Sequence, residues 1–190
     1  MSVETSLLVY EDYLALPEMR QRYEIIDGEM IMAPAPTPEH QWTLGNAYMQ
    51  FRAFVESRQL GIVLFAPVDV LIARDPLRVR QPDLLYLSAE RLGNLTLTEV
   101  LKRNPLDIAP DLVVEILSPT NTRIDMESKC TDYSTIGVRE CWLVSPEART
   151  VEVLRLTPRS IETLGIYGTG WIARSAVLPE LEFPVNTIFA

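Results

Sequence analysis

The chain has 190 residues, of which 47% are hydrophobic and 23% are charged, a balance typical of a folded protein that excludes an intrinsically disordered one. Its length predicts a single domain spanning residues 1–190, large enough to bury a core without disulfides. The formal net charge of −9 disfavours a general nucleic-acid binder, because affinity for the phosphate backbone comes largely from Lys and Arg.

Cysteine use and apolar patterning predict where the protein resides. Cys130 and Cys141 show neither CxxC nor Cys/His ligand spacing, which disfavours a zinc site and a disulfide framework. Residues 1–5 lack the basic start and apolar run of a signal peptide, and no apolar stretch approaches the ~18 residues that cross a bilayer. We therefore expect a cytoplasmic protein with no membrane partner.

Three elements are predicted in the amino-terminal half before the strands begin. Residues 7–19 carry apolar positions that suit a short helix. Asp27 and Gly28 separate two β-prone runs, which is a strong signal for a hairpin. Residues 40–57 repeat apolar side chains at three- and four-residue steps, which predicts an amphipathic helix lying against a sheet. Strands are predicted next, at 62–65, 68–72 and 82–87.

The carboxyl-terminal half is predicted to contain the centre of the sheet. The apolar run 112–117 is typical of a strand covered on both faces. Thr122 and Asp125 have capping-box spacing and Gly137 suits a left-handed stop, so a helix is predicted over 123–136. Two paired strands are predicted at 140–144 and 151–156, before a weakly patterned tail that begins after Trp171. These elements together indicate an α/β protein.

Glu115 is the most informative residue because it interrupts the apolar run 112–117. A buried ionised carboxylate needs a cation or a proton, although an edge position or a buried pair with an Arg would also explain it. Asp83 taken alone is an ordinary strand-start residue after Pro82. Together, Asp83 and Glu115 supply two carboxylates from two neighbouring strands, which Mg²⁺ accepts while it retains several waters.

Three further polar residues are candidates for the same site. Lys129 follows Asp125 by four residues and could form a surface pair of ~0.2–0.5 kcal/mol. If its helix packs beside the Glu115 strand, the ammonium could instead stabilise charge on a scissile phosphate. Glu24 could add a third carboxylate, although hairpin surfaces are normally polar. His40 is the only histidine and is too weak a signal to identify a general base.

The order and spacing of several motifs match a known family. These motifs are 22–29, His40, 81–83, 109–119, Asp125, Lys129, Tyr133 and 137–144. On these residues the chain resembles the PD-(D/E)XK nuclease superfamily, and more narrowly its Uma-type putative restriction endonuclease family.

The resemblance implies a restriction-endonuclease-like fold, with a mixed β-sheet core flanked by helices and with an N-terminal helix and β-hairpin. It implies that Asp83 and Glu115 are metal ligands and that the backbone carbonyl of Ile116 is a further ligand. The superfamily motif places a lysine where this chain has Leu117. The resemblance therefore implies that the basic role has moved to Lys129 on the following helix.

The predicted function is metal-dependent hydrolysis of phosphodiester bonds, with DNA as the substrate. Asp83 and Glu115 are expected to hold Mg²⁺ or Mn²⁺, Lys129 to stabilise negative charge, and Glu24 to be an accessory catalytic residue or ligand. A homodimer is expected because cutting both strands of a duplex often needs two sites.

Two other classes of function are alternatives to the nuclease. A catalytically silent scaffold of the same fold, binding a protein or a nucleic acid, is favoured by the net charge of −9. A two-carboxylate glycoside hydrolase would need a sugar cleft lined by aromatic residues, which the motif spacing does not indicate. Nucleotide-binding, serine-hydrolase and zincin motifs do not occur in the sequence.

Overall fold

The computed structural model describes residues 7–19, 21–119 and 121–190. Its largest element is a six-stranded sheet in the order β10-β9-β8-β7-β6-β3. The strands are β3 (Gly61–Phe65), β6 (Leu84–Ser88), β7 (Leu112–Ile116), β8 (Glu140–Ser145), β9 (Thr150–Thr157) and β10 (Ser160–Gly168). The β7–β8 pair is parallel and the other neighbouring strands are antiparallel, which confirms a mixed sheet.

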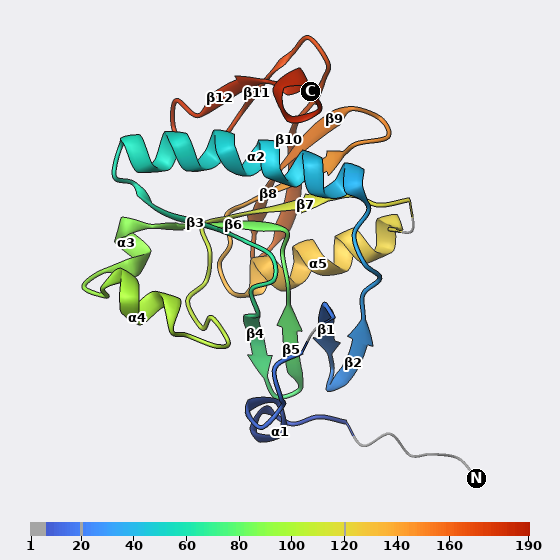
Figure 1. Cartoon of the computed structure of the whole chain (residues 1–190), viewed down its shortest axis with the longest axis vertical. Coiled ribbons are helices and arrows are strands. Elements are labelled where there is room, and N and C mark those ends of the chain that lie inside the picture. Colours follow the sequence, from blue (N-terminus) through green and yellow to red (C-terminus); the bar gives the residue numbers. More distant parts are fainter. Residues whose placement is uncertain (1–6, 20, 120) are drawn as a thin grey trace.

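A second, four-stranded sheet lies beside the first in the order β2-β1-β5-β4 (Figure 1). Its strands are β1 (Tyr23–Ile26), β2 (Glu29–Met32), β4 (Val70–Arg74) and β5 (Leu77–Arg80). Asp27 and Gly28 join β1 to β2 with positive φ angles of 52° and 83°, which the right-handed twist of a two-residue hairpin favours. The predicted hairpin is confirmed.

Two long helices cover opposite faces of the six-stranded sheet (Figure 1). Helix α2 (Pro38–Ser57) packs Phe51 and other apolar side chains into a core that includes Val114 of β7. Helix α5 (Arg123–Thr135) contributes Cys130 to a separate core that includes Val113. Successive residues of β7 therefore face different helices, and the predicted central strand, covered on both faces, is confirmed.

The sequence predictions were incomplete in two regions and too long in a third. Strand β5 and the short helices α3 (Ala89–Leu92) and α4 (Leu97–Leu101) were not predicted, and helix α1 covers only Tyr10–Leu14 of the expected 7–19. Strand β10 was also missed. The expected weakly patterned tail contains β11 (Ile172–Arg174), β12 (Glu182–Pro184) and the 3₁₀ helix η1 (Val185–Ile188). These pieces are too short to show a periodicity in sequence.

Among the residues that the structure describes, no helix combines the length and the apolar composition that crossing a membrane requires.

A buried carboxylate anchors the carboxyl-terminal segment to the large sheet. Glu140 of β8 is 0% exposed. Its Oε1 accepts hydrogen bonds from Trp142 Nε1 at 2.6 Å and Ser175 Oγ at 2.7 Å. Its Oε2 accepts from the backbone N–H groups of Ala176 at 2.7 Å and Val177 at 3.1 Å. Glu140 therefore collects donors from a segment about 35 residues away along the chain.

Replacing Glu140 should destabilise the fold because Glu140→Ala leaves several buried donors without an acceptor. We expect the free energy of unfolding, measured by urea denaturation, to fall by about 2 kcal/mol or more. Glu162→Ala is the matched control, since Glu162 is an exposed partner of Arg155 and its loss should change stability by about 0.5 kcal/mol at most. Equal losses in the two variants would contradict the anchoring role.

Candidate functional site

Strand pairing brings Asp83 and Glu115 close together at one end of the β6–β7 pair. The antiparallel register pairs Leu84 of β6 with Val114 of β7. Asp83 directly precedes β6 and Glu115 directly follows Val114, so the two residues lie close together at this end of the strand pair. Alternation along β7 gives Glu115 the face of Val113, which packs in the core on the α5 side. Glu115 therefore lies on the side of the sheet that α5 covers, and Asp83, which contacts His40 of α2, lies beside it.

Asp83 is 3% exposed and is held by three neighbouring groups. Its Oδ1 accepts a hydrogen bond from Arg22 Nη1 at 2.8 Å, and its Oδ2 accepts one from the backbone N–H of Ile116 at 2.8 Å. Nε2 of His40 lies 3.2 Å from the same Oδ2. Burial raises the pKa of Asp83, but the hydrogen bond with His40 and the charge of Arg22 outweigh it and hold the pKa below its usual value.

Glu115 is 4% exposed and receives both of its partners from α5. Lys129 Nζ lies 3.0 Å from Oε2, and the Tyr133 hydroxyl donates to Oε1 at 2.5 Å. Burial is the main reason that the pKa of Glu115 is raised. Lys129 opposes this effect, whereas the negative charges of Asp83 and Glu24 add to it. Burial therefore makes the Glu115 carboxyl harder to ionise than an exposed one, although a lysine lies beside it.

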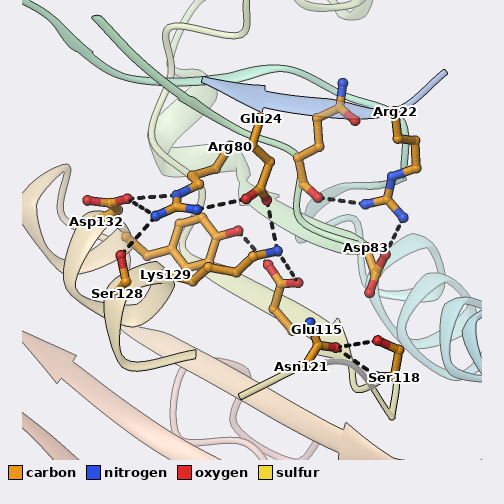
Figure 2. Close-up of polar contacts among 12 residues, drawn as sticks. Arg22, Glu24, Arg80, Asp83, Glu115, Ser118, Asn121, Ser128, Lys129 and Asp132 are labelled. Carbon is orange, nitrogen blue, oxygen red and sulfur yellow. Dashed lines mark hydrogen bonds and ion pairs between the residues drawn. The ribbon is translucent and has the colours of Figure 1, made fainter. Parts of the chain in front are cut away.

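Lys129 joins the two sheets, as Figure 2 shows. Its Nζ lies 2.8 Å from Oε1 of Glu24 in β1, in addition to its contact with Glu115 in β7. Burial lowers the pKa of Lys129, but the two carboxylates outweigh burial and raise it above its ordinary value. Asp125 instead caps the start of α5. Lys129 thus points into the polar cluster, and the alternative of a surface pair with Asp125 does not describe it.

The structure brings four of the predicted residues into one polar cluster between the two sheets and α5, namely Glu24, Asp83, Glu115 and Lys129. Sequence reasoning did not single out Arg22 or Arg80 as site residues. A signal for Arg80 was present, because Leu77-Arg78-Val79-Arg80 alternates apolar and basic residues as a half-buried strand does. The partners of these arginines lie far away along the chain, so the sequence alone did not reveal them.

A divalent metal ion at this site would need oxygen ligands from the carboxylates of the cluster. Among the described residues, no three His, Cys, Asp or Glu side chains gather into a group that could hold a metal. A carboxylate offers about four lone-pair sites, and Glu115 uses two of them for Lys129 and Tyr133. Mg²⁺ is commonly bound by one or two carboxylates while it keeps several waters. Asp83 and Glu115 therefore suit a two-carboxylate site completed by water or a backbone carbonyl.

Comparisons with known proteins agree with the fold. The family model Uma2, described as "Putative restriction endonuclease", matches residues 10–186. A crystal structure of a putative nuclease belonging to DUF820 from Anabaena variabilis ATCC 29413 is similar with a TM-score of 0.78 and 22% sequence identity. The similarity covers 96% of this chain and 97% of that chain, which shows a shared fold. The comparison with curated proteins found no match.

The raised pKa of Glu115 predicts how its replacement changes stability with pH. The stabilising contribution of a group with a raised pKa is fully present below its ordinary value of 4.5 and is lost as the pH rises through the folded-state pKa. In metal-free buffer, Glu115→Gln should therefore gain stability relative to the unmodified protein as the pH rises from 4.5 towards neutrality. Urea denaturation across this range measures the difference.

The control for this pH series is Glu127→Gln on the outer face of α5. Glu127 is 59% exposed and pairs with Arg123, so its stability difference should stay nearly flat over the same range. A Glu115→Gln difference that shrinks as the pH rises would contradict the inferred electrostatics.

Proposed function

The chain belongs to the Uma2 putative restriction endonuclease family, and from this premise we propose that it is a metal-dependent nuclease that hydrolyses phosphodiester bonds in DNA. The observation that carries the proposal is the buried cluster in which Asp83 lies near Glu115 and Lys129 contacts Glu115. Two carboxylates beside a cation are the components that metal-assisted phosphoryl chemistry requires.

In this proposal Asp83 and Glu115 hold Mg²⁺ or Mn²⁺, with the backbone carbonyl of Ile116 as a further ligand. When bound, the ion would supply an activated water and a polarised phosphate. The chain orients the carboxylates in advance, because Arg22 and the Ile116 N–H hold Asp83 while the Tyr133 hydroxyl holds Glu115. Orientation by such partners is the usual support for metal-binding carboxylates.

Lys129 is proposed to stabilise negative charge on the phosphate. Its pKa is raised by Glu115 and Glu24, so the side chain stays protonated at neutral pH and does not serve as a general base. A fixed ammonium in a site with little water has a strong electrostatic effect on a developing charge.

The remaining features of the proposal concern substrate, assembly and location. A bound divalent cation would offset part of the negative charge at the carboxylates, which lowers the electrostatic barrier to DNA. A homodimer would provide two sites for the two strands of a duplex. Cys130 and Cys141 are buried and free, which suits action in the reducing cytoplasm.

One observation favours a second candidate, a catalytically silent scaffold that binds a protein or a nucleic acid. Both carboxylate oxygens of Glu24 and of Glu115 already have partners within the chain. The negative charge of the carboxylates is therefore partly compensated by side chains of the same chain, so the fold could persist without a metal.

Metal binding discriminates between these candidates. Titration with Mn²⁺ or Mg²⁺ should raise the free energy of unfolding, by about 2.7 kcal/mol when the free ion is at 100 times its Kd. The melting temperature should rise with it. Asp83→Asn and Glu115→Gln should remove this stabilisation, because each loses a charged ligand. An unmodified protein that shows no stabilisation at any ion concentration would instead favour the silent scaffold.

Cleavage of DNA tests the proposed reaction. Purified protein with Mn²⁺ or Mg²⁺ should nick or cut plasmid or single-stranded DNA, and Glu115→Gln should abolish this. Lys129→Ala should lower turnover by about 100-fold or more and leave metal affinity nearly unchanged, because its proposed partner is the phosphate. The control Glu127→Gln should retain full activity. Activity that persists in Glu115→Gln would indicate a contaminating nuclease.

A further inference from the structure

Arg80, the last residue of β5, is a buried cation that contacts two other elements. It is 2% exposed, and its guanidinium uses all three nitrogens. Nε donates to Asp132 Oδ2 at 2.7 Å and Nη2 donates to Ser128 Oγ at 3.0 Å, both on α5. Nη1 donates to Glu24 Oε2 at 2.7 Å, on β1. The planar guanidinium therefore fixes Glu24 relative to α5, as Figure 2 shows.

Glu24, held by Arg80, also contacts the ammonium of Lys129. While Oε2 is held by Arg80, Oε1 lies 2.8 Å from Lys129 Nζ. The same Nζ lies 3.0 Å from Oε2 of Glu115. Lysine has a flexible four-carbon stem and three donors, so two fixed carboxylates restrict its ammonium and leave one donor for another ligand.

We propose that Arg80 is a positioning residue of this site: it fixes Glu24, and Glu24 holds the Lys129 ammonium against Glu115. Its importance for catalysis rests on the proposed function, in which Lys129 acts on the phosphate. Glu24 thereby takes the role of holding the lysine, because its two carboxylate oxygens contact Arg80 and Lys129.

The neighbouring arginine of β5 provides a matched control. Arg78 contacts Asp132 Oδ1 at 2.5 Å and Asp27 Oδ1 at 2.7 Å. It shares Asp132 with Arg80, but the contacts of Glu24 are with Arg80 and Lys129. Arg78→Gln therefore removes the same charge from the same strand and leaves the link from Arg80 to Lys129 intact.

The sequence makes a direct measurement of Lys129 feasible, because Lys102 and Lys129 are its only lysines. In protein labelled with ¹⁵N-lysine, NMR can follow exchange of the ammonium protons with water. Lys102 is exposed and should exchange rapidly, whereas the ammonium of Lys129, held by two carboxylates, should give a slowly exchanging signal. Lys102→Arg assigns the two signals. The measurement uses neither metal nor DNA.

Glu24→Gln and Arg80→Gln should each speed the exchange of the Lys129 protons by about tenfold or more, because the ammonium loses a fixed charged acceptor. Arg78→Gln should leave the exchange rate unchanged. A folded Arg80→Gln protein with the Lys129 signal of the unmodified protein would overturn the proposal. So would an Arg78→Gln protein that changes the signal as much as Arg80→Gln does.

Loss of Arg80 leaves Asp132 with less compensation, so the single variant could fail to fold. The double variant Arg80→Gln, Asp132→Asn removes a cation and an anion together, and it should show the same faster exchange of Lys129. Unchanged exchange in the folded double variant would also overturn the proposal. Because exchange is read without turnover, an inactive protein in which Lys129 is held as described would contradict only the proposed nuclease function.

Discussion

The burial of a charged carboxylate in the central strand is the constraint on which the candidate site depends. All five residues of β7 are buried, and Glu115 is one of them. An ionised carboxylate in such a place is unfavourable unless nearby donors and cations compensate it. Helix α5 supplies both Lys129 and Tyr133, which lie one helical turn apart and reach the same carboxylate. Helix α5 therefore has to pack over this part of the sheet for the buried charge of Glu115 to be compensated.

Two buried glutamates in neighbouring strands meet this requirement in different ways. Glu140 is surrounded by neutral donors, among them Trp142 and Ser175, and its contacts tie one part of the chain to another. Glu115 instead has a lysine as a partner and has lone pairs beyond the two that Lys129 and Tyr133 use. A set of neutral donors suits a structural anchor, whereas a cation beside available oxygens suits binding and chemistry. The groups that contact a buried carboxylate therefore indicate its role better than its degree of burial does.

The smaller sheet completes the cluster and connects the hairpin to the rest of the molecule. Arg78 and Arg80 leave β5 on the same side and both contact Asp132 of α5. Glu24 of β1 continues this series of ion pairs to Lys129. Buried ion pairs contribute little net stability, because desolvation offsets their attraction, but removing one member leaves an uncompensated charge. The network therefore specifies where the hairpin and α5 lie relative to each other more than it stabilises the fold.

The sequence by itself determined the elements whose signals are local. The Asp27-Gly28 turn, the amphipathic repeat of α2 and the capping box that begins α5 depend on neighbours within a few residues, and all three are present in the structure. The same kind of signal made Glu115 conspicuous, since one charged residue stood in an apolar strand. Tertiary structure alone decided the strand register that brings Asp83 close to Glu115, the contact of Arg80 with Glu24, and the burial of the segment after Trp171. The physical reason is that these features pair groups distant along the chain, and periodicity in one segment carries no information about the partner that another segment provides.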